Sequence, residues 1–163
     1  MNNDLHELFL DELADIYNAE QQLTKALPKL AKTAKNEQLR EAIQQHLQET
    51  ENHVSRLEQV FESLGESVKR KKCKGMEGLI EEGEEVMSEQ KDSDALDAGL
   101  IISAQKVEHY EIAAYGSLRS WAQQMGHNDA VELLKETLEE EKAADEKLTG
   151  IAESVVNTEA QGG

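Results

Sequence analysis

The stretch Val107-Glu-His-Tyr-Glu-Ile-Ala-Ala-Tyr115 lies in a segment whose apolar residues recur at alternating steps of four and three. This spacing is typical of a helix that buries one stripe of side chains inside a bundle. Two acidic residues of the stretch, Glu108 and Glu111, fall on that stripe. Because an uncompensated carboxylate is unfavourable in a core, we expect some other group to offset both charges.

The composition of the whole chain is that of a helical protein. Its 163 residues are rich in Glu, Lys, Ala, Leu and Gln, and only 4 % are aromatic. The alternating β-branched runs that are typical of strands are missing. We therefore predict an all-α fold with a single domain over residues 1–157 and a disordered tail over residues 158–163.

The net charge and the cysteine content limit which classes of partner the protein can bind and in which compartment we expect it. A net charge of −17 argues against nucleic acid, whose phosphates would be repelled. No apolar run approaches the ~20 residues that span a bilayer, and the first six residues do not resemble a secretory signal. The single cysteine, Cys73, suits a reducing compartment. We expect a cytoplasmic protein that binds neither nucleic acid nor membrane.

Four long amphipathic segments form two helical hairpins. The predicted helices span residues 3–34, 37–64, 95–124 and 129–156, and the hairpins span 3–64 and 94–157. Residues 65–93 connect the hairpins and contain one short amphipathic segment. Since this connector is long enough to cross the length of a bundle, it favours a ferritin-like four-helix bundle with one long crossover carrying a short extra helix.

Polar residues interrupt the apolar stripe of every predicted helix near its middle, and none of them is a lysine or an arginine. They are Glu20 in the first helix, His46, Thr50 and His53 in the second, Glu108 and Glu111 in the third, and Glu141 and Asp145 in the fourth. A single acidic residue on a stripe is more often paired with a neighbour than bound to a metal. The coincidence in all four helices favours a shared site.

The spacing of these residues from the turns predicts that they meet. Glu20 and Thr50 each lie fifteen residues from Lys35, and Glu111 and Glu141 each lie fifteen residues from Gly126. Residues equally far from the turn of an antiparallel hairpin lie at the same height, here ~22 Å along each helix. If the crossover packs the hairpins head to tail, the interruptions share one layer.

Carboxylates and imidazoles from four helices are the ligands of di-iron and di-manganese sites. We expect two iron or manganese ions, with Glu111 and Glu141 central and Glu20 and Glu108 terminal. The full set of predicted ligands is Glu20, His46, Glu49, His53, Glu108, Glu111 and Glu141. The alternative is a metal-free structural or interaction bundle without enzymatic activity, whose buried acids are protonated or paired.

Five motifs resemble the YciE/YciF-like family of bacterial stress proteins, a domain of unknown function in the ferritin-like superfamily. They are Asp15-Ile-Tyr-Asn-Ala-Glu20, His46-Leu-Gln-Glu-Thr50, Cys73-Lys-Gly-Met76 with Gly78-Leu-Ile, Lys106-Val-Glu-His-Tyr-Glu111 and Leu138-Glu-Glu-Glu141-Lys-Ala-Ala-Asp145. The resemblance implies a ferritin-like bundle, a homodimer and a dinuclear site. If the predicted metals are active, we expect them to reduce peroxide or oxygen, or to oxidise Fe(II).

The resemblance also identifies two departures from the superfamily's ligand pattern. That pattern has one Glu on the first and third helices and Glu-x-x-His on the second and fourth. Here Thr50-x-x-His53 has Thr in the place of Glu, and Glu141-x-x-Ala144 lacks the His. Glu49 and Asp145 are the candidates to replace the missing ligands.

Overall fold

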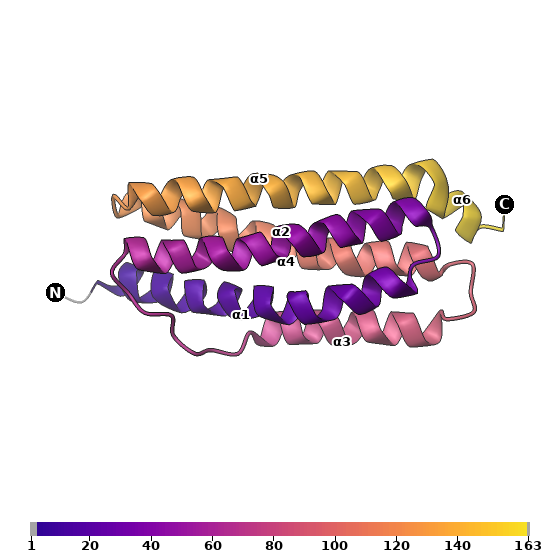
Figure 1. Ribbon diagram of the computed structural model, residues 1–163, viewed down its shortest axis with the longest axis horizontal. Helices are drawn as coiled ribbons and strands as arrows, with labels where there is room; N and C mark the ends of the chain where they lie inside the picture. Colours follow the sequence, from indigo (N-terminus) through magenta and orange to yellow (C-terminus); the bar gives the residue numbers. More distant parts are fainter. Residues whose placement is uncertain (1–2, 163) are drawn as a thin grey trace.

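The structure, a computed structural model, describes residues 3–162. Most of these residues are helical (Figure 1). The helices are α1 (Asp4–Thr33), α2 (Glu37–Ser63), α3 (Lys74–Glu89), α4 (Leu96–Gln124), α5 (Asn128–Ile151), the π-helical turn η1 (Ala152–Val156) and α6 (Asn157–Ala160). Residues 3–162 contain no strand, which confirms the all-α prediction. None of these helices combines the length and the apolar character needed to cross a bilayer. The first two residues of the predicted domain and the last residue of the predicted tail lie outside the described residues.

The two hairpins, α1–α2 and α4–α5, pack head to tail (Figure 1). The turn of one hairpin lies at the opposite end of the bundle from the turn of the other, so that α1 and α5 run one way and α2 and α4 the other. The connector therefore crosses the length of the bundle, and α3 makes up most of the crossing. This confirms the predicted bundle with one crossover and one short extra helix.

The helix ends follow from local sequence and from one contact between the hairpins. Gly65 and Gly126 adopt left-handed backbone conformations, with φ of 68° and 76°, just after α2 and α4. Asn36 caps α2 by accepting a hydrogen bond from the backbone of Leu39. The carboxylate of Asp97, in the first turn of α4, accepts hydrogen bonds from the backbone N–H groups of Lys35 and Asn36 at 2.9 and 2.7 Å. Asp97 thereby ties the two hairpins together.

The C-terminal segment differs from its prediction in two respects. The turn η1 accommodates one extra residue, so the apolar face shifts by one position and Val156 is buried where the stripe predicts Val155. Helix α6 then lies against α4 as far as Ala160. Residues 158–160 are therefore helical, and the tail predicted to begin at residue 158 does not begin there.

Helix α3 packs closely on α4 because two glycines remove side chains from the contact. A Cβ atom on Gly75 would lie 2.6 Å from the ring of Tyr110, and one on Gly99 would lie 2.6 Å from Val86. Separations this short do not occur between real side chains, so neither position has room for alanine without a shift of its neighbour. This close packing holds α3 against the side of the bundle.

Candidate metal centre

Six buried residues from four helices meet in one layer of the core. They are Glu20 of α1, His46 and His53 of α2, Glu108 and Glu111 of α4, and Glu141 of α5. Their side chains form two overlapping groups, each of which offers four ligand atoms within 4.8 Å of one another. The enclosed group is Glu20, His53, Glu111 and Glu141, and the outer group is His46, Glu108, Glu111 and Glu141. Two adjacent metal ions that share Glu111 and Glu141 would fit this arrangement.

The oxygens at the centre of the layer have no hydrogen-bond partner. Both carboxylate oxygens of Glu111 and both of Glu141 are buried and unpartnered, as are one oxygen each of Glu20 and Glu108. Unpartnered buried carboxylates are rare because nothing replaces their lost hydration. A pair of divalent cations would supply the missing interactions, so the residues present fit the metals that the bundle topology implies.

The two histidines approach the carboxylates without forming well-aligned hydrogen bonds. His46 Nε2 lies 3.0 Å from Glu108 Oε1, and His53 Nδ1 lies 2.9 Å from Glu141 Oε1. Both nitrogen atoms nevertheless remain without a hydrogen-bond partner. The ligand atoms thus converge on common points, which is the geometry expected around a metal ion.

Burial and mutual repulsion govern protonation in this layer. Burial raises the pKa of Glu111 well above 4.5, and the nearby Glu141 and Glu20 raise it further. Burial and Glu141 likewise raise the pKa of Glu108. Burial alone would raise the pKa of Glu141 too, but interactions with Glu108 and His53 lower it. Without metal, the centre therefore holds protons on some carboxylates, and metal binding would release them.

His53 is held from outside the layer by Glu140 and Arg56. His53 Nε2 lies 2.8 Å from Glu140 Oε2, and the guanidinium of Arg56 contacts both oxygens of Glu140 at 3.0 and 3.1 Å. Because Nε2 is engaged by Glu140, Nδ1 faces the enclosed group. Burial lowers the pKa of His53, but its interactions with Glu140, Glu141 and Glu20 outweigh burial and raise it to about 11.

Tyr115 holds Glu20 in a similar way. Its hydroxyl donates a hydrogen bond to Glu20 Oε1 at 3.1 Å, which leaves Oε2 without a partner. The tyrosine ring also packs edge-on against the ring of His53, with 6.2 Å between their centroids. Both terminal ligands of the enclosed group are therefore fixed by residues behind them.

The structure does not bring Glu49, Thr50 or Asp145 into either group. Glu49 is half-buried and accepts a hydrogen bond from Gln45 at 3.2 Å. The hydroxyl of Thr50 bonds to the backbone oxygen of His46. Asp145 Oδ2 lies 3.3 Å from His109 Nε2, and its side chain is 19 % exposed.

Both imidazoles of the centre come from α2. His46 and His53 are seven residues apart, so they lie on one face of the helix about 10.5 Å from each other along its axis. One histidine reaches each group, and the outer group is completed without a histidine from α5.

The sequence patterns do not single out Glu140 and Arg56, because both lie beside the apolar stripes. The available signal is their spacing: Arg56 follows His53 by three residues, and Glu140 directly precedes Glu141. Residues three apart lie on neighbouring parts of a helix surface. A polar residue in such a position next to a predicted ligand is a candidate to support it.

Comparisons with known proteins agree with this architecture. The model of a family described as a domain of unknown function (DUF892) matches residues 4–161. Protein YciF of Escherichia coli (strain K12) is 51 % identical over 158 residues, which cover 96 % of this chain and 95 % of YciF. The crystal structure of YciF, which is described as a stress protein, matches with a TM-score of 0.91 over 96 % of this chain and 99 % of YciF.

A second solved structure is also similar. It is YcfI from Rhodopseudomonas palustris, described as a putative structural protein. Its sequence is 45 % identical, and it matches with a TM-score of 0.85 over 91 % of this chain and 97 % of YcfI.

Proposed function

The chain belongs to this DUF892 family, and from that premise we propose that it is a stress-associated protein that binds two iron or manganese ions in the core of its bundle. The observation that carries the proposal is the set of unpartnered oxygens on Glu111 and Glu141, which both ligand groups share. A purely structural core would be expected to pair or replace such groups. The stress association rests on the description of YciF.

Each side chain has a distinct part in this proposal. Glu111 and Glu141 would contribute to holding both ions, with Glu20 and His53 at the enclosed position and His46 and Glu108 at the outer position. Two reduced ions would each supply one electron, which with two protons converts dioxygen into hydrogen peroxide or hydrogen peroxide into two waters.

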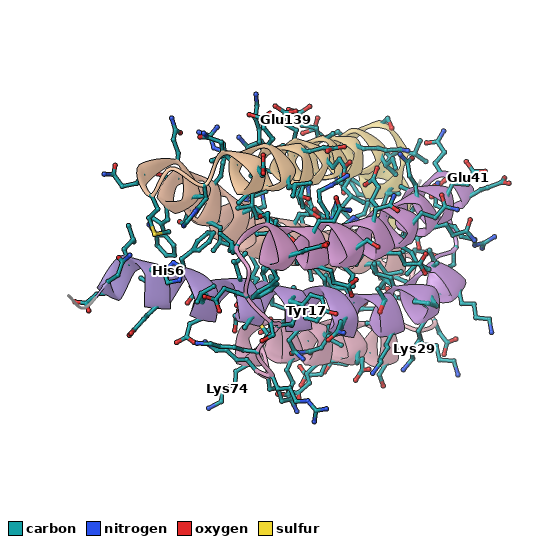
Figure 2. All side chains as sticks on the ribbon, turned by 60° about the vertical axis from the view of Figure 1, so that its left-hand side comes forward. His6, Tyr17, Lys29, Glu41, Lys74 and Glu139 are labelled. Atoms are coloured by element: carbon teal, nitrogen blue, oxygen red, sulfur yellow. The ribbon has the colours of Figure 1, made fainter. Side chains whose placement is uncertain are left out.

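Metal content of a matched pair of variants tests the proposal. Glu141→Gln removes the charge of a shared ligand, whereas Glu139→Gln changes the same helix at an outward-facing side chain (Figure 2). We expect about two metal ions per chain in wild type and in Glu139→Gln, and close to none in Glu141→Gln, by elemental analysis after Fe(II) or Mn(II) reconstitution. Less than about half an equivalent in reconstituted wild type would refute metal binding.

The second candidate is the metal-free structural or interaction bundle, which the description of YcfI as a putative structural protein favours. In that case, protonation would offset the buried carboxylates, and Glu111→Gln would leave the thermal stability unchanged or raise it, because it replaces a buried acid whose two oxygens have no hydrogen-bond partner. Adding Fe(II) or Mn(II) would then leave the melting temperature of wild type unchanged. Metal binding instead predicts that the melting temperature rises with metal concentration.

A further inference from the structure

Two pockets approach the metal centre from its outer edge. Both are lined by Leu27, His46, Ala104 and Glu108, so they end at the same two ligands. One pocket, the mixed pocket, opens beside α2 and α5, where Gln45, Glu49 and Lys147 line it together with the aliphatic side chains of Ala42, Ile43, Ala143, Ala144 and Leu148. The apolar pocket opens between α1, α3 and α4. The two pockets differ in the chemistry of their walls although they reach one place.

The walls of the apolar pocket consist mainly of aliphatic side chains. They are Leu23, Ala26, Leu27, Leu30, Leu79, Ile80, Met87, Ala104 and Val107. Exposed charged residues of the lining, Lys25, Lys29 and Glu84, belong to the surface of α1 and α3, and Lys29 is seen on α1 in Figure 2. Ser103 also lines the pocket, and its hydroxyl already donates to the backbone oxygen of Gly99 at 2.9 Å. A polar or charged molecule would therefore lose its hydration in such a passage and gain few hydrogen bonds.

The volume of the apolar pocket limits what it can hold. About 100 Å³ is open to the centres of water-sized molecules. One such molecule needs ~10–15 Å³ by this measure, whereas sites for drug-sized ligands enclose ~300–1,000 Å³. The pocket therefore has room for a few diatomic or triatomic molecules and is too small for a typical organic substrate.

We propose that the apolar pocket between α1, α3 and α4 is the route by which dioxygen reaches the His46–Glu108 edge of the metal centre. This inference rests on the proposed function and names the oxidant of that site. Dioxygen is small, neutral and apolar, so it is the oxidant that this lining accepts. Hydrogen peroxide, which forms hydrogen bonds, finds partners in the mixed pocket at Gln45, Glu49 and Lys147.

Gly83 of α3 provides a way to close the pocket without touching a ligand. It lines the apolar pocket, and a Cβ atom placed on it would lie 3.7 Å from Ser103 Cβ, an ordinary contact. Gly83→Ala is therefore accommodated and serves as the control. The longer side chain of Gly83→Leu must extend into the pocket. Ala26→Leu, on the α1 wall, closes the same pocket from the other side.

Xenon binding to the metal-free protein tests the pocket independently of metal chemistry. An apolar cavity of about 150 Å³ binds xenon, so a pocket of this kind is a suitable target. We expect xenon between α1, α3 and α4 in crystals of wild type and Gly83→Ala, and none there in Gly83→Leu or Ala26→Leu. Absence of xenon from the wild-type pocket would overturn the inference.

Rapid-mixing kinetics of the Fe(II)-loaded protein test the route itself. We expect Gly83→Leu and Ala26→Leu to bind as much iron as wild type. Their bound iron should be oxidised by dioxygen at about one tenth of the wild-type rate or below, whereas Gly83→Ala should stay close to wild type. Oxidation by hydrogen peroxide should keep its wild-type rate in all three variants. Full iron content with an unchanged dioxygen rate, or equal slowing with both oxidants, would overturn the route and leave the proposed function standing. Failure of wild type to bind iron would overturn both.

Discussion

The two ends of the candidate metal centre are built differently. At the enclosed end, His53 and Glu20 are at most 1 % exposed, and Glu140 and Tyr115 hold them from behind. At the outer end, His46 is 8 % exposed, neither of its ring nitrogens has a hydrogen-bond partner, and both pockets reach it. In the proposed function, the enclosed end would therefore fix a metal ion firmly, and the outer end would admit small molecules.

The largest expected effect comes from a residue that belongs to both ends. Glu111→Ala should abolish binding of both ions, because Glu111 is common to the two ligand groups. The stabilisation by metal should vanish with it, about 4 kcal/mol at a metal concentration a thousand times the dissociation constant. Calorimetry with and without Mn(II) measures this difference. Retention of one tightly bound ion would show that Glu111 is not shared.

Replacing each histidine separately should distinguish the two ends. His53→Ala leaves the buried Glu20 and Glu141 without their positive partner, while Glu140 keeps Arg56, so we expect the metal-free protein to lose about 3 kcal/mol in free energy of unfolding. His46→Ala should lose less than about 1 kcal/mol, since His46 is supported by fewer contacts. Denaturant unfolding of the metal-free proteins makes the comparison. Equal losses would mean that the two ends are equally anchored.

Loss of the support behind His53 should weaken metal binding without removing a ligand. Arg56→Gln leaves Glu140 without its bidentate partner, and we expect the affinity at the enclosed end to fall by about 10- to 100-fold. Lys147→Gln makes the same change of charge at the outer end, where Lys147 bonds to Gln45. Competitive titration with a chelator compares the two variants. Similar losses in both would point to general electrostatics rather than to the anchor.

A further expected effect is the pH dependence of the metal-free protein. The pKa of His53 is raised from 6.5 to about 11, so its contribution to stability is complete below pH 6.5 and is lost as the pH rises through about 11. The raised pKa of Glu111 acts in the same direction, since its contribution is complete below pH 4.5 and lost above it. The pKa of Glu140, lowered from 4.5 to about 2 by His53, acts oppositely: its contribution is present above pH 4.5 and lost as the pH falls through about 2.

We therefore expect the melting temperature of the metal-free protein to be highest in mildly acidic solution and to fall toward alkaline pH. Each proton involved changes the stability by about 1.4 kcal/mol per pH unit. Metal binding displaces those protons, so the stabilisation by added Mn(II) should increase with pH. Scanning calorimetry from about pH 5 to about pH 9 measures both trends. A metal-free protein that becomes more stable toward pH 9 would contradict the assigned protonation.

The sequence predicted the location of the candidate centre because a helix has a fixed rise. Glu20, Glu111 and Glu141 lie equally far from the turns of their hairpins, and the structure places them in one layer. Glu49 is not in that layer, because it lies one position off the buried stripe of α2. Its role as a ligand stays a prediction that metal binding would test.

Glu140 and Arg56 could not be predicted in the same way. Their function depends on the contact between α2 and α5, which brings together residues more than eighty positions apart in the chain. A residue just outside an apolar stripe can face solvent or a neighbouring helix, and the helical repeat alone does not distinguish the two. The helical residues 158–160 were missed for a similar reason, since α6 lies against α4.

The sequence by itself determined the helices, the crossover and the height at which the acidic residues meet, because hydrophobic periodicity and helical rise are local properties. Only the tertiary structure decided that α2 supplies both histidines, that His53 is anchored while His46 is open, and that α3 leaves an apolar pocket leading to His46. These features depend on how neighbouring helices are rotated and how closely they approach, and side-chain packing between distant segments fixes both.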